Sequence, residues 1–177
     1  MLNLMLLRHA KSSLATAGQR DFDRPLNGRG QRAAAAMGRY MASQDLVPQL
    51  LLCSPAKRAR ETLSLLAKEL KAAPETLIVP EIYDFGDGKA LIKCLRDRAG
   101  AAQSVLLVGH NPAIGALAQN LAGGSSGKFL ERLHTKYPTA ALAVISFDLD
   151  NWQSLEAGSG TLLRFVTPKD LGVDKGD

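Results

Sequence analysis

Short, continuous apolar runs alternate with stretches of helical periodicity along most of this 177-residue chain. The clearest runs cover residues 4–7, 50–53 and 104–108, and each gives way at once to polar residues. Strands that are apolar on both faces are typical of parallel sheets covered by helices, because neither face meets water. The sequence therefore predicts an α/β fold, a three-layer αβα sandwich with a mainly parallel sheet and helices on both faces.

The intervening segments predict the rest of the architecture. We expect helices over residues 28–42, from Pro55 to about 71, over 88–98 and after Pro112, with further strands over 76–79, 141–147 and 162–166. The glycine-rich residues 123–127 predict a break in the chain, and residues 168–177 predict a frayed tail. The length and the lack of a linker favour one domain spanning 1–177.

Charge and cysteine content narrow the function classes. Lys plus Arg number 22 and Asp plus Glu 17, so the net charge is 22 − 17 = +5, which favours anionic ligands but is too small to indicate nucleic acid. Cys53 and Cys94 lie far apart and fit neither a disulfide framework nor a zinc site. Because Arg8 interrupts the first apolar run and no later run approaches a membrane span, we expect a cytoplasmic protein without a membrane partner. The oligomeric state stays open.

Polar side chains follow the predicted strands where these end. Arg8-His9 follows the first strand, residues 54–58 the second, and His110-Asn111 the strand at 104–108. Because the carboxyl ends of parallel strands share one edge of a sheet, these residues should meet there. Residues 14–27, a long loop with several charges, are expected to be functional as well.

Two imidazoles and two guanidiniums at one sheet edge suit phosphoryl transfer through a covalent histidine intermediate. Arg58 lies one turn into a helix that Ser54 is predicted to cap, so its side chain can lean back to the edge. Together with Arg8 and the helix start it would form a phosphate or carboxylate pocket. A metal hydrolase is the weaker alternative, because no carboxylate pair accompanies His9 and His110 and arginines repel a metal ion.

Three blocks occur in an order and spacing that resemble a known family. They are Arg8-His9-Ala10-Lys11-Ser12, residues 54–62, and Gly109-His110-Asn111-Pro112. They are similar to the histidine phosphatase superfamily and, within it, to the short bacterial SixA-type phosphohistidine phosphatases. Residues 23–27 and 80–83 fit the same family, so the resemblance covers nearly the whole chain. It implies a phosphoglycerate mutase-like fold and no cofactor.

The resemblance also implies roles for individual residues. His9 would be the nucleophile, while Arg8, Arg58 and His110 would form the phosphate pocket, with Ser12 as a minor contact. Family members with ester substrates use a carboxylate general acid. Glu81 occupies the best place for that acid, and Asp84 and Asp87 lie close to it in sequence.

The chain lacks the long insertions with which larger members of this family enclose small substrates, so an open pocket is expected. An open pocket suits a phosphorylated protein side chain, and a phosphoramidate needs less from a general acid than an ester does. We therefore expect a metal-independent phosphatase acting on phosphohistidine in a partner protein. The alternatives are a phosphomonoesterase acting on a small phosphorylated metabolite and a non-catalytic phosphate-binding or docking module. A module that only binds phosphate or docks to a partner would have no use for a nucleophile such as His9.

Overall fold

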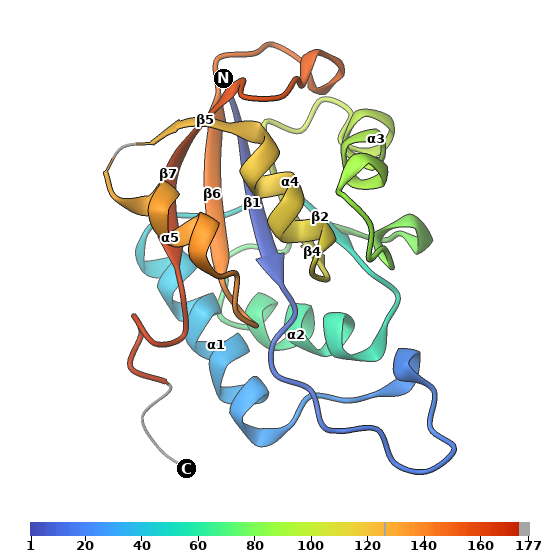
Figure 1. The fold of residues 1–177 in the computed structure, drawn as a ribbon. Helices are drawn as coiled ribbons and strands as arrows, with labels where there is room; N and C mark the ends of the chain where they lie inside the picture. The colour runs from blue at the N-terminus through green and yellow to red at the C-terminus, as the bar shows by residue number, and fades with distance from the viewer. Residues whose placement is uncertain (126, 174–177) are drawn as a thin grey trace.

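The described residues, 1–125 and 127–173 of the computed structural model, build a seven-stranded sheet with the strand order β3-β2-β4-β1-β6-β7-β5. All strands run in one direction except β6, which is antiparallel to both neighbours, so the predicted mainly parallel sheet is confirmed (Figure 1). The strands are β1 (Leu2–Arg8), β2 (Leu50–Cys53), β3 (Glu75–Ile78), β4 (Ser104–Gly109), β5 (Ala122–Ser125), β6 (Leu142–Phe147) and β7 (Gly160–Val166).

Helices cover both faces of this sheet and complete the predicted three layers. The five helices of the described residues are α1 (Gly28–Ser43), α2 (Lys57–Ala67), α3 (Lys89–Arg98), α4 (Ala113–Leu121) and α5 (Phe129–Thr135). Leu4 and Leu6 of β1 enter the core under α3, α4 and α5, whereas Met5 and Leu7 enter the core under α1 and α2. Each such buried side chain contributes roughly 1.5–3 kcal/mol, so the alternation along β1 holds both layers to the sheet.

The segment that leaves β1 is fastened against the start of α1. The Asn27 side chain accepts a hydrogen bond from the Gly30 backbone N–H at 2.8 Å, and the Asn27 backbone N–H donates to the Lys11 carbonyl at 3.0 Å. A Cβ atom at Gly30 would lie 2.0 Å from that carbonyl oxygen, so only glycine allows this approach. The loop that follows β1 is therefore held at a defined place beside the sheet edge.

The predicted chain break at residues 123–127 is wrong in part. Ala122–Ser125 forms the edge strand β5, which pairs with β7 through an irregular register. A Cβ atom at Gly123 would lie 2.0 Å from the carbonyl oxygen of Gly158, so glycine here permits close packing rather than a break. Ser126, which belongs to the predicted break, lies outside the described residues.

The ends of the predicted elements differ from the structure in two further places. Helix α2 begins at Lys57 and ends at Ala67, which makes it shorter than expected. Beyond β7, turns place Leu171 and Val173 against the core, whereas residues 174–177 lie outside the described part, where the expected fraying stays a prediction. None of the helices in 1–125 and 127–173 is long and apolar enough to cross a membrane.

Candidate active site

Four of the predicted site residues converge where β1 and β4 end. Arg8 closes β1 opposite Gly109, and the His9 backbone N–H donates to the Gly109 carbonyl at 3.0 Å. This pairing brings the rings of His9 and His110 to 5.1 Å between centroids. Arg58 reaches the same place from the first turn of α2. The parallel pairing of β1 and β4 thus joins residues about a hundred positions apart.

The hydrogen bonds of His9 define its protonation state. Its Nδ1 lies 2.8 Å from the Ala10 carbonyl oxygen, and Arg58 Nε lies 3.2 Å from its Nε2. Since a carbonyl only accepts and a guanidinium only donates, Nδ1 carries the proton and Nε2 keeps a lone pair. Burial, with the positive charges of Arg58 and Arg8, lowers the pKa of His9 from 6.5 to about 4. His9 is therefore neutral at neutral pH, as the nucleophilic role predicted for it requires.

His110 lies beneath the surface and contacts the same arginine. Arg58 Nη2 approaches its Nδ1 at 3.4 Å, and its Nε2 lies 2.7 Å from Ser54 Oγ. Burial is the main cause that lowers the pKa of His110 to about 3, and the neighbouring His9 and Arg58 lower it further. Ser54, predicted to cap the second helix, instead holds this imidazole, and Ala56 stands at the N-cap position of α2. The cap prediction was wrong because the Ser54 hydroxyl faces the adjacent strand exit.

Arg58 is the central cation of the site and is only 1% exposed. Its Nη1 donates to the backbone carbonyl of Asp21 at 2.7 Å, and its Nη2 pairs with the Asp21 carboxylate at 3.0 Å. Behind it, Thr62 Oγ1 donates to the Arg58 carbonyl at 2.7 Å and accepts from the Ala10 N–H at 3.0 Å. These contacts fix the guanidinium between both imidazoles and the loop after β1.

Asp21 is the site residue that sequence reasoning missed. It begins a short 3-10 helix, Asp21–Asp23, inside the long loop that was expected to be functional. Burial alone would raise the pKa of its carboxyl, but hydrogen bonds from Tyr83, at 2.7 Å, and from Arg58 lower that pKa to about 2. The loop contains several charged residues at irregular spacing. Only the fold shows that Asp21, and not another of them, contacts Arg58.

A cavity of about 300 Å³ opens over these groups. The aromatic ring of Phe85 lines it, and the centroid of this ring lies 4.9 Å from that of His110. The ring of Tyr83 lies 5.3 Å from His110, and neither of these two residues is among those that line the cavity. Ser12 lines the cavity, as the predicted minor contact requires. Its other lining residues are Arg8, His9, Lys11, Leu14, Asp21, Arg24, Arg58, Phe85, Asn111 and Thr139.

Arg8 adds a second guanidinium to this cavity. Its Nη1 donates to the Tyr137 carbonyl at 2.9 Å, and its Nε is buried without a hydrogen-bond partner. Burial and the neighbouring charge of Arg58 lower the pKa of Arg8, which reflects a buried site with several positive charges. Two guanidiniums beside a neutral imidazole favour an anionic, electrophilic group such as a phosphoryl group.

The structure does not bring the predicted general acid to this cavity. Glu81 is exposed and its carboxylate pairs with Arg98 of α3 at 3.1 Å, because the turn that contains it directs the side chain away from the sheet edge. Asp84 accepts from the backbone of its own turn, and Asp87 pairs with Lys89 at 2.9 Å. Within the described part of the chain, no three His, Cys, Asp or Glu residues are grouped so as to hold a metal ion.

Comparison with known proteins defines the class of this protein. The family model of the histidine phosphatase superfamily (branch 1) matches residues 4–84, which include Arg8, His9 and Arg58. An uncharacterized protein of Mycobacterium tuberculosis is 32% identical over 92% of this chain and 100% of its own length. The chain belongs to the histidine phosphatase superfamily.

Within this superfamily, SixA proteins are similar to the chain over nearly its whole length. Phosphohistidine phosphatase SixA of Escherichia coli is 26% identical over 98% of this chain and 99% of its own. The crystal structure of a protein from Agrobacterium tumefaciens, provisionally assigned as phosphohistidine phosphatase SixA, matches this chain with a TM-score of 0.77 and 29% sequence identity. The match covers 94% of this chain and 99% of that protein. The predicted phosphoglycerate mutase-like α/β fold and the resemblance to SixA are confirmed.

Proposed function

We propose that the protein is a metal-independent phosphatase that removes the phosphoryl group from phosphohistidine in a partner protein by way of a phosphorylated His9. The observation that carries this proposal is the protonation state of His9. Its Nδ1–H is held by the Ala10 carbonyl, and its Nε2 lone pair lies in a cavity that Arg8 and Arg58 also line. The name of the Escherichia coli relative, phosphohistidine phosphatase, supports the same substrate.

In the first step the phosphoryl group draws Arg58 Nε away from His9 Nε2, and the freed lone pair of Nε2 attacks phosphorus. The phosphorus–nitrogen bond of the substrate breaks, and its electron pair goes to the departing imidazole, which takes up a proton from solvent. Arg8 and Arg58 donate hydrogen bonds to the phosphoryl oxygens, where negative charge concentrates. The Ala10 carbonyl accepts from Nδ1–H and so stabilises the positive charge of the phosphorylated His9 ring.

In the second step a water oxygen attacks phosphorus, the bond to His9 Nε2 breaks, and inorganic phosphate leaves. Arg58 Nη2 faces His110 Nδ1 at 3.4 Å, which places the ring proton on Nε2 as long as that contact is made. His110 can support both steps once the phosphoryl group takes over Arg58 Nη2, because Nδ1 can then carry the proton and donate to a phosphoryl oxygen. Ser54 allows this tautomer, because its hydroxyl can donate to His110 Nε2 while its oxygen accepts from the Ala56 N–H at 3.3 Å. We therefore assign Ser54 a positioning role.

The acid–base properties of the cavity favour a phosphoramidate over an ester. Among the described residues that line it, Asp21 is the one carboxylic acid, and its lowered pKa keeps it ionised at neutral pH. An ionised carboxylate cannot give a proton to a departing alkoxide. An imidazole leaving group is protonated readily and does not need that help, so phosphohistidine fits this cavity better than a sugar phosphate.

The rim of the cavity supports a protein as the partner. Phe85 is 46% exposed and Leu14 is 89% exposed, and both line the opening. Exposed apolar side chains around a polar site are typical of surfaces that contact other proteins. The exposed ring of Phe85 also offers an aromatic face on which a substrate imidazole can stack.

Turnover measurements with two substrate classes test the proposal. The purified protein should hydrolyse a phosphohistidine-carrying protein with a kcat/KM at least about a hundredfold above that for sugar phosphates, since general acid catalysis is worth at least that much to an ester. Addition of EDTA should leave the rate unchanged. A preference for sugar phosphates would contradict the proposed substrate, and loss of activity with EDTA would contradict metal independence.

A further inference from the structure

A second cavity of about 320 Å³ adjoins the active-site cavity. The two share Arg8, Lys11 and Thr139 as lining residues. The second cavity continues away from His9 towards α1 and towards the connection between α5 and β6, where Arg29 and Lys136 complete its wall. A substrate that places its phosphoryl group over His9 therefore has this cavity directly beside it.

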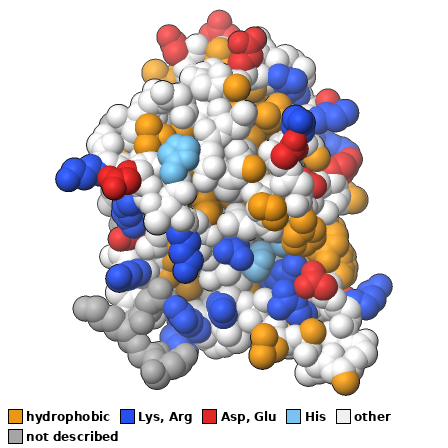
Figure 2. Space-filling model, viewed as in Figure 1, with side chains coloured by type: hydrophobic (Ala, Val, Ile, Leu, Met, Phe, Trp, Pro, Cys, Tyr) orange, Lys and Arg blue, Asp and Glu red, His pale blue; other side chains and the backbone are white. Residues whose placement is uncertain are grey.

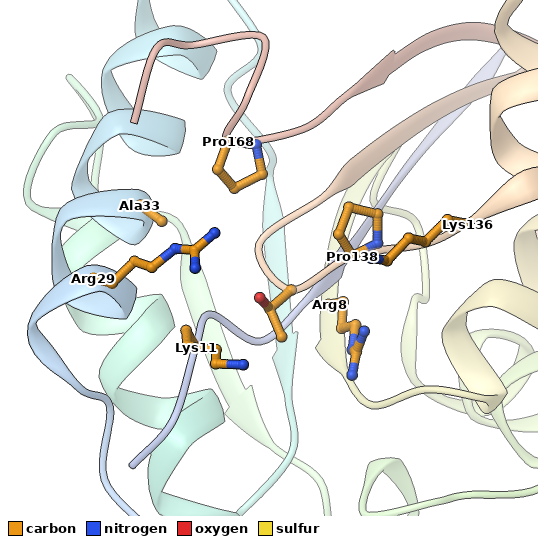
Figure 3. A pocket seen from close by; sticks show the side chains of 8 residues that line it. Arg8, Lys11, Arg29, Ala33, Lys136, Pro138 and Pro168 are labelled. Carbon is orange, nitrogen blue, oxygen red and sulfur yellow. The ribbon is translucent and has the colours of Figure 1, made fainter. Parts of the chain in front are cut away.

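Four of the residues lining the second cavity are cations that come from separate parts of the chain. Arg8 ends β1, Lys11 follows in the next segment, Arg29 belongs to the first turn of α1, and Lys136 follows α5. Figure 3 shows Arg29 and Lys11 on one side of the cavity and Arg8 and Lys136 on the other. Because the positions are fixed by different elements, this is a pocket of the fold and not a run of charges along one helix.

The described residues that line this cavity carry positive charge only. None of its described lining residues is acidic, whereas Asp21 lies in the wall of the active-site cavity. Figure 2 shows Lys and Arg side chains gathered on this face around a hollow in which a histidine is visible. Cations that line one concave wall repel one another and raise the local concentration of anions. The second cavity is thus suited to an anionic group attached to the substrate.

We infer that this cavity, formed by Lys11, Arg29 and Lys136 beside Arg8, binds carboxylate side chains that flank the phosphohistidine of the partner protein. The inference rests on the proposed function, since it concerns the same substrate. The apolar rim at Leu14 and Phe85 favours a protein over a small bisphosphorylated ester as the source of the anion, because a small ester would not cover that rim. The cavity thereby selects phosphohistidines in acidic surroundings.

Two phosphohistidine peptides, one with Glu and one with Gln on both sides of the phosphohistidine, test this inference. The unaltered protein should show a KM about tenfold lower for the Glu peptide at low ionic strength, and this difference should shrink in high salt. The double substitution Arg29→Glu and Lys136→Glu should abolish the preference while the variant still hydrolyses the Gln peptide. The matched control, Lys68→Glu with Lys71→Glu, makes the same change in net charge at two exposed lysines that line neither cavity, and it should keep the preference.

The outcomes separate the two proposals. If neither peptide is hydrolysed, the proposed function fails, and the cavity loses its proposed ligand with it. If both are hydrolysed with equal KM, or if the double variant keeps the preference, the inference about the second cavity is overturned while the proposed function stands. A KM for a small bisphosphorylated ester well below that for the Glu peptide, raised by the same double substitution, would also overturn the carboxylate assignment.

Discussion

The protonation states of two imidazoles determine what this site can do. His9 holds its Nδ1 proton against a carbonyl and directs Nε2 to Arg58, while His110 shares the same guanidinium. A positive ring beside two arginines is unfavourable, and burial adds to that cost, so both pKa values fall. The site therefore keeps His9 neutral, and the nucleophilic role proposed for it needs no neighbouring base.

Nuclear magnetic resonance titration of the imidazole nitrogens tests these states directly. His9 and His110 should stay neutral from about pH 8 down to about pH 5, since the folded protein disfavours their cationic forms. His9 should take up a proton only near pH 4, and His110 only near pH 3. A midpoint near the ordinary 6.5 for either ring would contradict the assigned environment.

Asp21 competes with the phosphoryl group for Arg58. Its carboxylate holds Nη2 at 3.0 Å, and it would repel a phosphoryl dianion bound there. Asp21→Asn keeps an oxygen that can accept from Arg58 but removes the negative charge. Inorganic phosphate should therefore inhibit this variant about twofold to fivefold more strongly than the unaltered protein, as expected for an exposed charge contact. The measurement is the inhibition constant of phosphate at fixed pH and salt.

A neighbouring aspartate supplies the control for that experiment. Asp23 pairs with Arg20 at 2.7 Å outside the cavity, so Asp23→Asn removes the same charge from the same short helix. Inhibition by phosphate should change little in this variant. Equal effects of the two substitutions would show that Asp21 acts only through overall charge, and weaker inhibition of Asp21→Asn would show that its carboxylate is needed to hold Arg58.

At the level of the elements, the strand ends could be predicted and the loops could not. The apolar runs of β1, β2 and β4 are continuous, and the polar residues that follow them include Arg8, His9, Arg58 and His110. These strands are buried on both faces, so burial alone determines their pattern. The contacts of Asp21 and Ser54 in the site depend on which loop crosses which strand end. Contacts of this kind leave no periodic signal in the sequence.

The edge strand β5 was missed for a related reason. Glycine lowers the strand propensity of Ala122–Ser125, and the pairing with β7 depends on close approach to Gly158. The helix α5 was missed too, since it is short, fully buries only Leu133 and shows little periodicity. Tertiary packing decides both elements.

Substitution of Gly123 tests this explanation of β5. In Gly123→Ala the new Cβ would lie 2.0 Å from the Gly158 carbonyl oxygen, so the backbone of one strand or turn must shift. We expect the free energy of unfolding in urea to fall by about 1–3 kcal/mol, the range seen for overpacked sites. Gly124→Ala is the matched control, because its Cβ would meet nothing within 4 Å. Equal stability of both variants would contradict this role of Gly123.

Across the whole molecule, rigid and adaptable parts have separate tasks. Arg8 ends strand β1, His9 directly follows it, and Arg58 stands in the first turn of α2. These elements are packed into the central layers, which keeps the geometry of the three side chains constant. Asp21 and Phe85 belong to connections at the rim, where partner contacts can vary without disturbing the sheet. Lys and Arg side chains gather on the face that carries the site, around the hollow seen in Figure 2.

Trapping of the phosphorylated enzyme tests the central claim most directly. The protein is mixed with a radioactively phosphorylated phosphohistidine protein, quenched in alkali within milliseconds to seconds, and digested for peptide mapping. We predict a label that is stable in alkali and labile in acid, carried by His9 and absent from His9→Ala, whose turnover is abolished. Turnover that persists in His9→Ala, or a label on any other residue of the unaltered protein, would contradict the proposed role of His9.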